Sequence, residues 1–155
     1  MDNITTIIFD WGDTLMRDYP ELSGPMCSWN HVEIIPNVDT VIQELSKKYR
    51  LIVAANADES DAHQIALALE RVMLKDYFTD FFSSKDIGVK KPHIDFFNHI
   101  FKQTSVQPHE CIMIGNTYEK DIVGGKNAGM TTIFFNEFNT SGNYPLADYT
   151  IINTH

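Results

Sequence analysis

Short apolar runs rich in β-branched residues recur along the chain, separated by segments in which apolar residues repeat at helical spacing. Each run has the length and composition of a buried strand. The runs occupy residues 4–9, 51–55, 111–114 and 131–135, with shorter strand candidates at 78–83 and 149–152. Strands that alternate with helices are typical of an α/β domain in which helices cover both faces of a mostly parallel sheet.

Four helical segments are expected between these strands, and they begin at or near residues 38, 58, 92 and 118. Asn37 is the candidate N-cap of the first, and Asp58 is expected to open the second, which runs through Val72. Pro92 suits the first turn of the third helix, where a missing backbone N–H matters least. Gly129 is expected to close the fourth helix, because glycine tolerates the left-handed backbone found at such ends.

The chain has 155 residues and is 43% hydrophobic, which is enough apolar material for the core of one domain. Residues 17–36 form an irregular stretch that contains proline and glycine. The rest of the sequence shows no repeat, low-complexity tract or linker. Residues 1–155 are therefore expected to form a single domain.

The net charge of −9 and the lack of any large Lys/Arg cluster argue against nucleic acid as the main partner. The two cysteines lie far apart in sequence, which predicts neither a disulfide framework nor a cysteine metal site. No signal peptide is recognisable, and no apolar run approaches the roughly 18 residues that a membrane span needs. We expect a cytoplasmic protein without a membrane partner; its oligomeric state stays open.

Polar residues stand where the predicted strands end. In open α/β sheets, ligands bind beyond the carboxyl ends of the strands, at the point where the strand order reverses. The residues expected there are Asp10, Asn56, Ser83, Ser84 and Asn116, with Lys91 on a loop nearby. The sequence therefore predicts a polar site at this edge of the sheet.

The stretches FDWGDTL, LIVAANA, GVKKP and IMIGNTYEKDIVGGKNAGM follow one another in the order of the four motifs of haloacid dehalogenase-like hydrolases. The resemblance covers residues 4–152, and its first and last motifs are the most specific. It implies a three-layer Rossmann-like α/β domain with a central, mostly parallel sheet. Most members of that family are phosphatases.

The resemblance also implies roles for individual residues. In that family an aspartate at the end of the first strand attacks phosphorus and becomes an aspartyl-phosphate, with Mg²⁺ bound against it. Matched to the family motifs, Asp10 and Lys91 are the catalytic residues, and Lys91 also binds the phosphoryl group. The implied Mg²⁺ ligands are Asp10, the Gly12 carbonyl, Asn116 and Asp121. Trp11, beside the nucleophile, and Asn56, at the second motif, are the candidate substrate contacts by their positions.

Three positions depart from the family pattern. Gly12 replaces the second aspartate of the first motif, which protonates the leaving group, and Asp13 follows one residue late. Adjacent residues in a tight helical turn differ in direction by about 100°, so Asp13 does not simply replace that acid. Ala55 lacks the hydroxyl of the second motif, although Asn56 follows it, and Asn116 replaces a metal-binding aspartate. These losses predict an enzyme that is slow or narrow in its substrates.

The segment 17–36 is too short for the cap domain that encloses substrates in many members of that family. Residues 57–89 are accounted for by a helix and a strand, which leaves no room for a cap there. We therefore expect a capless domain with a short flap at 17–36. Trp11, beside the predicted nucleophile, either forms a wall of the pocket or is simply buried.

The sequence predicts a Mg²⁺-dependent phosphatase that acts through Asp10 on a phosphorylated small molecule. An alternative is a degenerate, non-catalytic member of the family that binds a phosphorylated ligand or a protein partner. Transfer of the phosphoryl group to an acceptor other than water is also open, because fold-level resemblance does not define a substrate.

Overall fold

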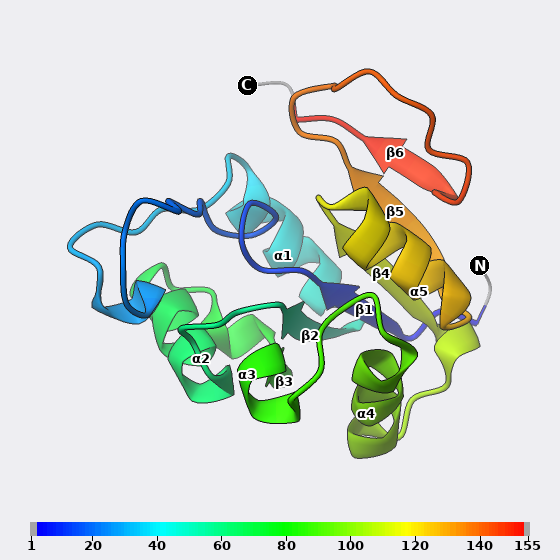
Figure 1. Cartoon of the computed structure of the whole chain (residues 1–155), viewed down its shortest axis with the longest axis horizontal. Coiled ribbons are helices and arrows are strands. Elements are labelled where there is room, and N and C mark those ends of the chain that lie inside the picture. The colour runs from blue at the N-terminus through cyan, green and yellow to red at the C-terminus, as the bar shows by residue number, and fades with distance from the viewer. Residues whose placement is uncertain (1–2, 154–155) are drawn as a thin grey trace.

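In the computed structural model, which describes residues 3–153, six parallel strands form one sheet in the order β3-β2-β1-β4-β5-β6. The strands are β1 (Thr6–Phe9), β2 (Arg50–Ala55), β3 (Asp80–Ser83), β4 (Cys111–Gly115), β5 (Thr131–Phe135) and β6 (Tyr149–Ile151). All six lie within the predicted runs or one residue beyond them. The expected α/β fold with a parallel sheet is confirmed, and β1 lies at its centre between β2 and β4 (Figure 1).

The connections between the strands carry helices. They are α1 (Val38–Ser46), α2 (Ala62–Arg71), α3 (Ser84–Ile87), α4 (Ile94–Thr104) and α5 (Gly124–Asn127). A π-helical segment, Tyr118–Val123, leads directly into α5. Shorter 3-10 turns occupy Met26–Ser28, Lys75–Tyr77 and Pro108–Glu110. Helix α3 lies outside the helical segments predicted from the sequence.

Two predicted helix starts are wrong by a few residues. The second helix begins at Ala62 rather than Asp58, because Asp61 is its N-cap. The Asp61 carboxylate accepts a hydrogen bond from the Gln64 N–H (2.8 Å), and the Gln64 side chain accepts one from the Asp61 N–H (3.0 Å). This reciprocal pair satisfies two backbone donors that a helix start otherwise leaves open. Similarly, α4 begins at Ile94, two residues after Pro92.

Two further predictions concern helix ends. Asn37 does precede α1, but its backbone is left-handed (φ 72°) and its side chain makes no capping hydrogen bond. Asn37 thus occupies the predicted N-cap position, but its side chain does not cap the helix. Gly129 has a φ of +96°, as expected for the residue that closes a helix, although the segment before it combines a π-helical turn with α5 instead of forming one α-helix.

Successive residues of the central strands pack on opposite faces of the sheet. Ile7 of β1 belongs to a buried cluster with Ile42 of α1 and Leu69 of α2. Ile8 belongs to a second cluster with Phe97 of α4. A fully buried side chain of this size contributes about 1.5–3 kcal/mol relative to an exposed one, so the two clusters hold the central strands in place. Both faces of the sheet are covered, as the apolar runs predicted.

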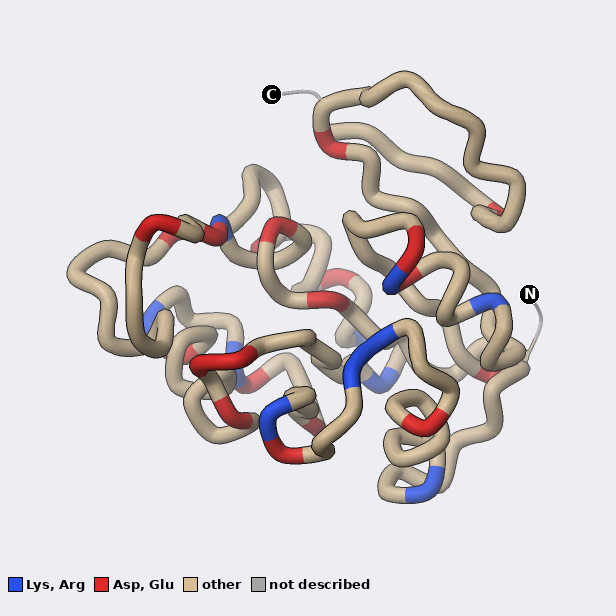
Figure 2. The backbone as a smooth tube through the Cα atoms, in the orientation of Figure 1, with Lys and Arg blue, Asp and Glu red and all other residues tan. Residues whose placement is uncertain are grey.

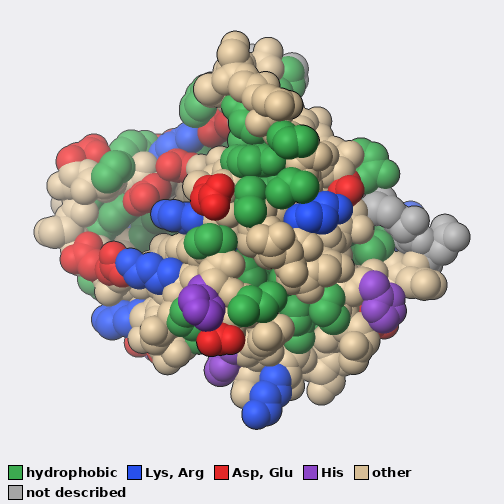
Figure 3. Space-filling view, turned by 45° about the vertical axis from the view of Figure 1, so that its right-hand side comes forward, with side chains coloured by type: hydrophobic (Ala, Val, Ile, Leu, Met, Phe, Trp, Pro, Cys, Tyr) green, Lys and Arg blue, Asp and Glu red, His purple; other side chains and the backbone are tan. Residues whose placement is uncertain are grey.

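The chain ends in a segment that follows β5 and returns as β6 at the edge of the sheet (Figure 1). Its exposed large hydrophobic residues are Phe138, Leu146, Tyr149, Ile151 and Ile152. Figure 3 shows hydrophobic side chains gathered on the face below this segment. Among the helices of residues 3–153, none combines the length and the apolar character that crossing a bilayer requires.

Candidate active site

The site lies where β1, β2 and β4 end side by side. Asp10 directly follows β1, Asn56 follows β2 and Asn116 follows β4. The Asp10 N–H donates to the Ile114 carbonyl (2.9 Å), which extends the sheet pairing by one residue and holds the aspartate at the end of the strand. The chain runs outward through β2 and β3 and then returns to the other side of β1, so this is the point of the sheet where ligands are expected.

At this edge of the sheet, Lys91 forms ion pairs with two aspartates, Asp10 and Asp121. Its Nζ lies 2.9 Å from Asp10 Oδ1, 2.7 Å from Asp121 Oδ1 and 2.9 Å from the Ala54 carbonyl oxygen. Its side chain is only 1% exposed. Burial alone would lower the pKa of this ammonium group, but the charges of Asp10 and Asp121 outweigh burial and raise the pKa. Lys91 is therefore a buried ammonium group beside Asp10, and the two aspartates favour its charged form.

Asp121 supplies the second negative charge. Burial, together with the charge of Asp10, raises the pKa of its carboxyl to about 6, against the opposing effect of Lys91. Its Oδ2 accepts a hydrogen bond from the Thr117 N–H (3.1 Å). Gly115 makes this position possible, because a Cβ there would lie 2.2 Å from the Asp121 carboxyl carbon. Any larger residue at 115 would force the aspartate away from Lys91.

Positive charge is scarce in the protein, with 12 lysines and arginines against 21 aspartates and glutamates. Figure 2 shows this excess along the backbone and a basic stretch on the loop between α3 and α4. That loop carries Lys90 and Lys91. Lys90 is exposed and pairs with Asp58 at the surface (2.9 Å), whereas Lys91 turns inward. The two neighbouring lysines thus have different roles.

Thr14 is a site residue that the sequence analysis missed. Its hydroxyl lies 3.2 Å from Asp10 Oδ2 and 3.3 Å from Asn116 Oδ1. The threonine therefore links the first and fourth motifs and brings a carboxylate oxygen and an amide oxygen to one side of the site. The signal was present in FDWGDTL, where Thr14 follows Asp10 by four residues.

Asn56 contacts the main chain of Lys91 with both ends of its amide. Its Nδ2 donates to the Lys91 carbonyl (3.0 Å), and its Oδ1 accepts from the Lys91 N–H (2.9 Å). Both ends of this amide thus hold the Lys91 main chain, and one of the two Nδ2 hydrogens has no part in these bonds, so donation from the amide to a phosphoryl group stays a prediction. A contact between the backbone N–H of Asn56 and a substrate stays a prediction.

Ser83 and Ser84 stabilise the loop after β2 instead of facing a ligand. The Ser83 hydroxyl donates to the Ser60 carbonyl (2.6 Å), and the Ser84 hydroxyl accepts from the Ala57 N–H (3.0 Å). Both serines are buried. Their expected place in the polar site is therefore corrected: they define the shape of the loop that borders it.

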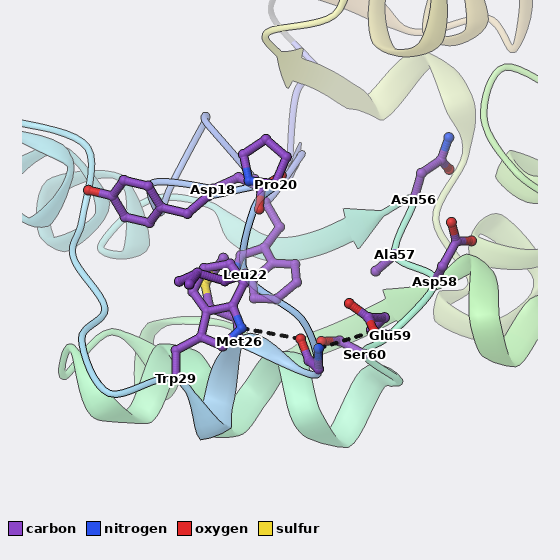
Figure 4. Close-up of a pocket in the computed structure, with 14 residues that line it drawn as sticks. Asp18, Pro20, Leu22, Met26, Trp29, Asn56, Ala57, Asp58, Glu59 and Ser60 are labelled. Carbon is purple, nitrogen blue, oxygen red and sulfur yellow. Dashed lines mark hydrogen bonds between the residues drawn. The ribbon is translucent and has the colours of Figure 1, made fainter.

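A pocket of about 270 Å³ opens beside Asp10, between this loop and the segment 17–36, which we call the flap. Figure 4 shows flap residues on one side of the pocket and residues 56–60 on the other. Its lining is Trp11, Gly12, Asp18, Tyr19, Pro20, Leu22, Gly24, Met26, Trp29, Asn56, Ala57, Asp58, Glu59 and Ser60. Asp10 and Lys91 are not part of the lining, but Trp11 and Gly12 connect them to it.

Trp11 satisfies both interpretations left open above. It is 5% exposed, and its indole N–H donates to the Met16 sulfur (3.2 Å). It also lines the pocket. The tryptophan is thus a buried residue whose remaining surface forms a wall next to Asp10.

Asp13 contacts the first two residues of the flap, Arg17 and Asp18. Its backbone is left-handed (φ 58°), and its Oδ1 accepts a hydrogen bond from the Asp18 N–H (3.1 Å). The same oxygen lies 3.5 Å from Arg17 Nη1. The local role predicted for Asp13, ordering the turn and the start of the flap, agrees with these contacts.

Asp18 is a second residue that the sequence analysis missed. It lies on the flap side of the pocket (Figure 4). The residue as a whole is exposed, but its carboxyl is partly buried. This burial is the larger cause that raises the pKa of the Asp18 carboxyl, and the negative charge of Asp13 is the second. No motif marks Asp18, because its approach to the site depends on the path of the flap.

The residues predicted to bind Mg²⁺ offer oxygen atoms, which this ion prefers. Asp10 and Asn116 present theirs on one side of the site, joined through Thr14. Both oxygens of Asp121 already accept hydrogen bonds, so its geometry favours holding Lys91, and its direct ligation stays a prediction. Within residues 3–153, no cluster of three or more His, Cys, Asp or Glu side chains forms a metal site. The donor set fits Mg²⁺ in type but carries little negative charge.

Known proteins resemble this chain in sequence and in fold. The family model for haloacid dehalogenase-like hydrolases matches residues 7–135. The N-acylneuraminate-9-phosphatase of Rattus norvegicus is 32% identical over 117 residues, which cover 75% of this chain and 45% of that protein. The glyceraldehyde 3-phosphate phosphatase of Methanothermobacter thermautotrophicus is 31% identical over 102 residues, covering 65% and 44%. The chain thus spans less than half the length of these relatives.

Solved structures show the same fold. The putative HAD-hydrolase YfnB from Bacillus subtilis superposes with a TM-score of 0.78 at 19% identity, covering 96% of this chain and 94% of that chain. A HAD phosphatase from Thermococcus onnurineus superposes with a TM-score of 0.67 at 27% identity, covering 77% and 54%. The family model covers most of the chain, and the fold agrees with it. The protein belongs to the haloacid dehalogenase-like hydrolase family.

Proposed function

We infer that the protein hydrolyses phosphomonoesters of small molecules, with Asp10 as the nucleophile. The observation that carries this proposal is the buried arrangement of Lys91 between Asp10 and Asp121. A carboxylate and a phosphate group repel each other, and a fixed ammonium group beside the carboxylate reduces that repulsion. Burying three ionised side chains is costly, and a purely structural role would be served equally well by apolar residues.

Each side chain has a defined part in the proposed reaction. The Asp10 carboxylate attacks phosphorus and forms an aspartyl-phosphate, which water then hydrolyses. Lys91 attracts the phosphoryl oxygens, and Asp121 and the Asn56 amide keep the lysine in position. Thr14 orients the Asp10 carboxylate through its hydroxyl. All of these contacts exist before a substrate binds, so little reorganisation is needed.

Mg²⁺ is the proposed cofactor. Asp10, the Gly12 carbonyl and Asn116 would hold it, and the bound ion would neutralise charge between the carboxylate and the phosphoryl group. Because Asn116 is neutral, we expect binding to be weak.

The relatives support a phosphorylated small molecule as substrate. Their names refer to N-acylneuraminate 9-phosphate and glyceraldehyde 3-phosphate, and the pyrimidine 5′-nucleotidase YjjG of Escherichia coli is 39% identical over 69 residues, covering 44% of this chain and 31% of that protein. We propose that residues 1–155 act as one domain and that the flap takes the place of a cap over the pocket. The Arg71 guanidinium, which donates to the Cys27 and Trp29 carbonyl oxygens (3.1 and 2.6 Å), ties the flap to α2.

A second candidate function follows from Gly12, Ala55 and Asn116, which each lack a group that family members use. The same Lys91–Asp10 arrangement could hold a phosphorylated ligand without turnover. In that case the protein would be a binding module for the ligand or for a protein partner.

An assay of phosphate release distinguishes the phosphatase from the binding module. The purified protein is incubated with Mg²⁺ and a panel of phosphorylated sugars, nucleotides and acyl phosphates. Asp10→Asn is the matched control, because the amide keeps the size of the side chain and removes its nucleophilic charge. We expect release from at least one substrate and none from the variant. Equal rates for the two proteins would contradict the nucleophile. Binding of a phosphorylated compound without release by either protein would favour the binding module.

A further inference from the structure

The proposed reaction needs a proton donor that position 12 does not supply. When the phosphorus–oxygen bond breaks, the leaving oxygen takes the bonding electrons, and an alkoxide leaves poorly without a proton. The residue at position 12, two beyond the nucleophile, is glycine. The nearby Asp13 carboxylate is engaged with the start of the flap.

We propose that Asp18 of the flap supplies this carboxyl group, as general acid in the first step and general base in the second. This inference rests on the phosphatase function proposed above. It assigns a catalytic role to a residue outside the four family motifs.

The placement of Asp18 carries the inference. A Cβ added to Gly12 would lie 3.5 Å from Asp18 Cβ and 3.8 Å from both its carboxyl carbon and Oδ2. The Asp18 side chain therefore lies in van der Waals contact with the place that a Cβ at position 12 would take. Both residues line the pocket beside Trp11. A carboxyl delivered from the flap thus stands next to the backbone position that lacks one.

The start of the flap is built to hold Asp18 in this place. Its N–H donates to Asp13 Oδ1 (3.1 Å). The preceding residue, Arg17, forms two hydrogen bonds to the Glu137 carboxylate, at 2.9 and 2.7 Å, and Glu137 is 7% exposed. Asp13 thereby holds the main chain of Asp18, and Glu137 holds the side chain of the preceding Arg17. Fixing a catalytic group in advance lowers the entropic cost of the reaction.

The other acidic residues that line the pocket have different partners. Asp58 pairs with Lys90 (2.9 Å), and the Glu59 carboxylate accepts a hydrogen bond from the Gly24 N–H (3.1 Å). Within residues 3–153, Asp18 forms no salt bridge that would commit its carboxylate. Of the three, Asp18 is the one placed beside Gly12.

One carboxyl group accounts for the proton transfers of both steps. In the first, an Asp10 oxygen bonds to phosphorus, the bond to the leaving oxygen breaks, and the Asp18 carboxyl donates its proton to that oxygen. The alcohol departs and Asp18 is left as a carboxylate. In the second, Asp18 takes a proton from water while the water oxygen bonds to phosphorus. The bond to Asp10 then breaks, phosphate is released and both side chains return to their starting forms.

The test compares kcat/KM for two phosphomonoesters that differ in leaving group, para-nitrophenyl phosphate and glycerol phosphate. The first leaves without a proton and the second requires one. Asp18→Asn should lower kcat/KM for glycerol phosphate about 10²-fold, within the range for loss of general acid catalysis, and change the nitrophenyl value little. Glu21→Gln removes one negative charge from the same flap and should change neither.

A rescue variant separates chemistry from a structural effect. Gly12→Asp in the Asp18→Asn background should restore part of the glycerol phosphate activity, because a Cβ at position 12 would make only ordinary van der Waals contacts and would carry a carboxyl group beside position 18. In the wild-type background the same change should add little. Equal losses with both substrates in Asp18→Asn, no loss with either, or no rescue would overturn the role of Asp18. So would a wild-type protein that hydrolyses only the nitrophenyl ester.

Different results would contradict the proposed phosphatase function. If the wild-type protein releases phosphate from neither ester and from none of the panel above, the phosphatase itself is wrong, and the role of Asp18 is lost with it. Turnover that disappears in Asp10→Asn but is unchanged in Asp18→Asn overturns the role of Asp18 alone.

Discussion

Replacing Lys91 with methionine tests whether the buried charges beside Asp10 depend on this lysine. Methionine has a similar length and no charge, so the change removes the ammonium group with little change in volume. It leaves Asp10 and Asp121 facing each other, with Asp121 only 1% exposed. Breaking a buried ion pair by removing one partner costs about 3–5 kcal/mol, because the remaining charge is uncompensated.

The structure sets the pH dependence of this cost. Without Lys91, the folded protein can avoid a buried charge by protonating Asp121, whose pKa of about 6 is already above its ordinary value of 3.8. Holding a proton costs about 1.4 kcal/mol for every pH unit above the pKa of the unfolded state. The variant therefore loses more stability at about pH 7.5 than at about pH 5.5, where the Asp121 carboxyl of the wild-type protein, with its pKa of about 6, also holds a proton. Because the folded pKa is the raised one, the variant becomes relatively more stable as the pH falls.

Urea unfolding at both pH values measures the free energy of unfolding, provided that the m-value is unchanged. Lys90→Met is the matched control: the neighbouring lysine is exposed, and its loss should have little or no measurable effect. The double variant Lys91→Met/Asp121→Asn should recover most of the lost stability, because it removes the uncompensated charge. A loss below about 1 kcal/mol, the same loss at both pH values, or no recovery in the double variant would refute the reasoning.

Two further predictions concern metal binding and thiol reactivity. Asn116→Asp adds a charged oxygen beside Asp10 and should tighten Mg²⁺ binding in titration calorimetry; unchanged or weaker affinity would remove Asn116 from the metal site. Cys111 is fully buried and burial raises its pKa to about 12, so in the folded protein near neutral pH we expect a thiol reagent to modify the half-buried Cys27 first and Cys111 only after urea is added. Equal modification of both thiols without urea would show that the Cys111 side of the sheet opens readily.

The sequence predicts the sheet well, because each apolar strand run ends directly at a polar residue or a turn. The run that ends at Phe9 is apolar and β-branched, and Asp10 follows it directly, so both the strand and its site-facing end were visible. The approach of Lys91 to Asp10 joins residues far apart in the chain. It followed only from the family resemblance, because local spacing carries no information about such contacts.

Helix starts were harder to predict, because one residue type serves several purposes. Asp58 and Asp61 are both good N-caps by type, and the contact between Asp61 and Gln64 decides between them. Asn37 is favoured both as a cap and in the left-handed conformation, and the structure uses it for the second. These alternatives have similar local energies, so tertiary packing selects among them.

Three residues of the candidate site show how far prediction from the sequence reaches. Thr14 stands inside a motif and could have been found from its position after Asp10. Asp18 could not, since its distance from Gly12 depends on the path of the flap, and Arg17, Glu137 and Asp13 set that path. The contact of the Asn56 amide with the main chain of Lys91 could not be predicted either, because a linear motif does not reveal it.

The most direct test of the central proposal is detection of a covalent phosphoenzyme at Asp10. The protein is mixed with Mg²⁺ and acetyl phosphate or para-nitrophenyl phosphate, quenched rapidly in acid, digested and examined by mass spectrometry, with Asp10→Asn treated in parallel. We predict that one phosphoryl group appears on the peptide that contains Asp10, that hydroxylamine removes it as it does an acyl phosphate, and that the variant shows none. Phosphate release without this adduct, or an adduct on another residue that persists in Asp10→Asn, would contradict the nucleophilic role of Asp10.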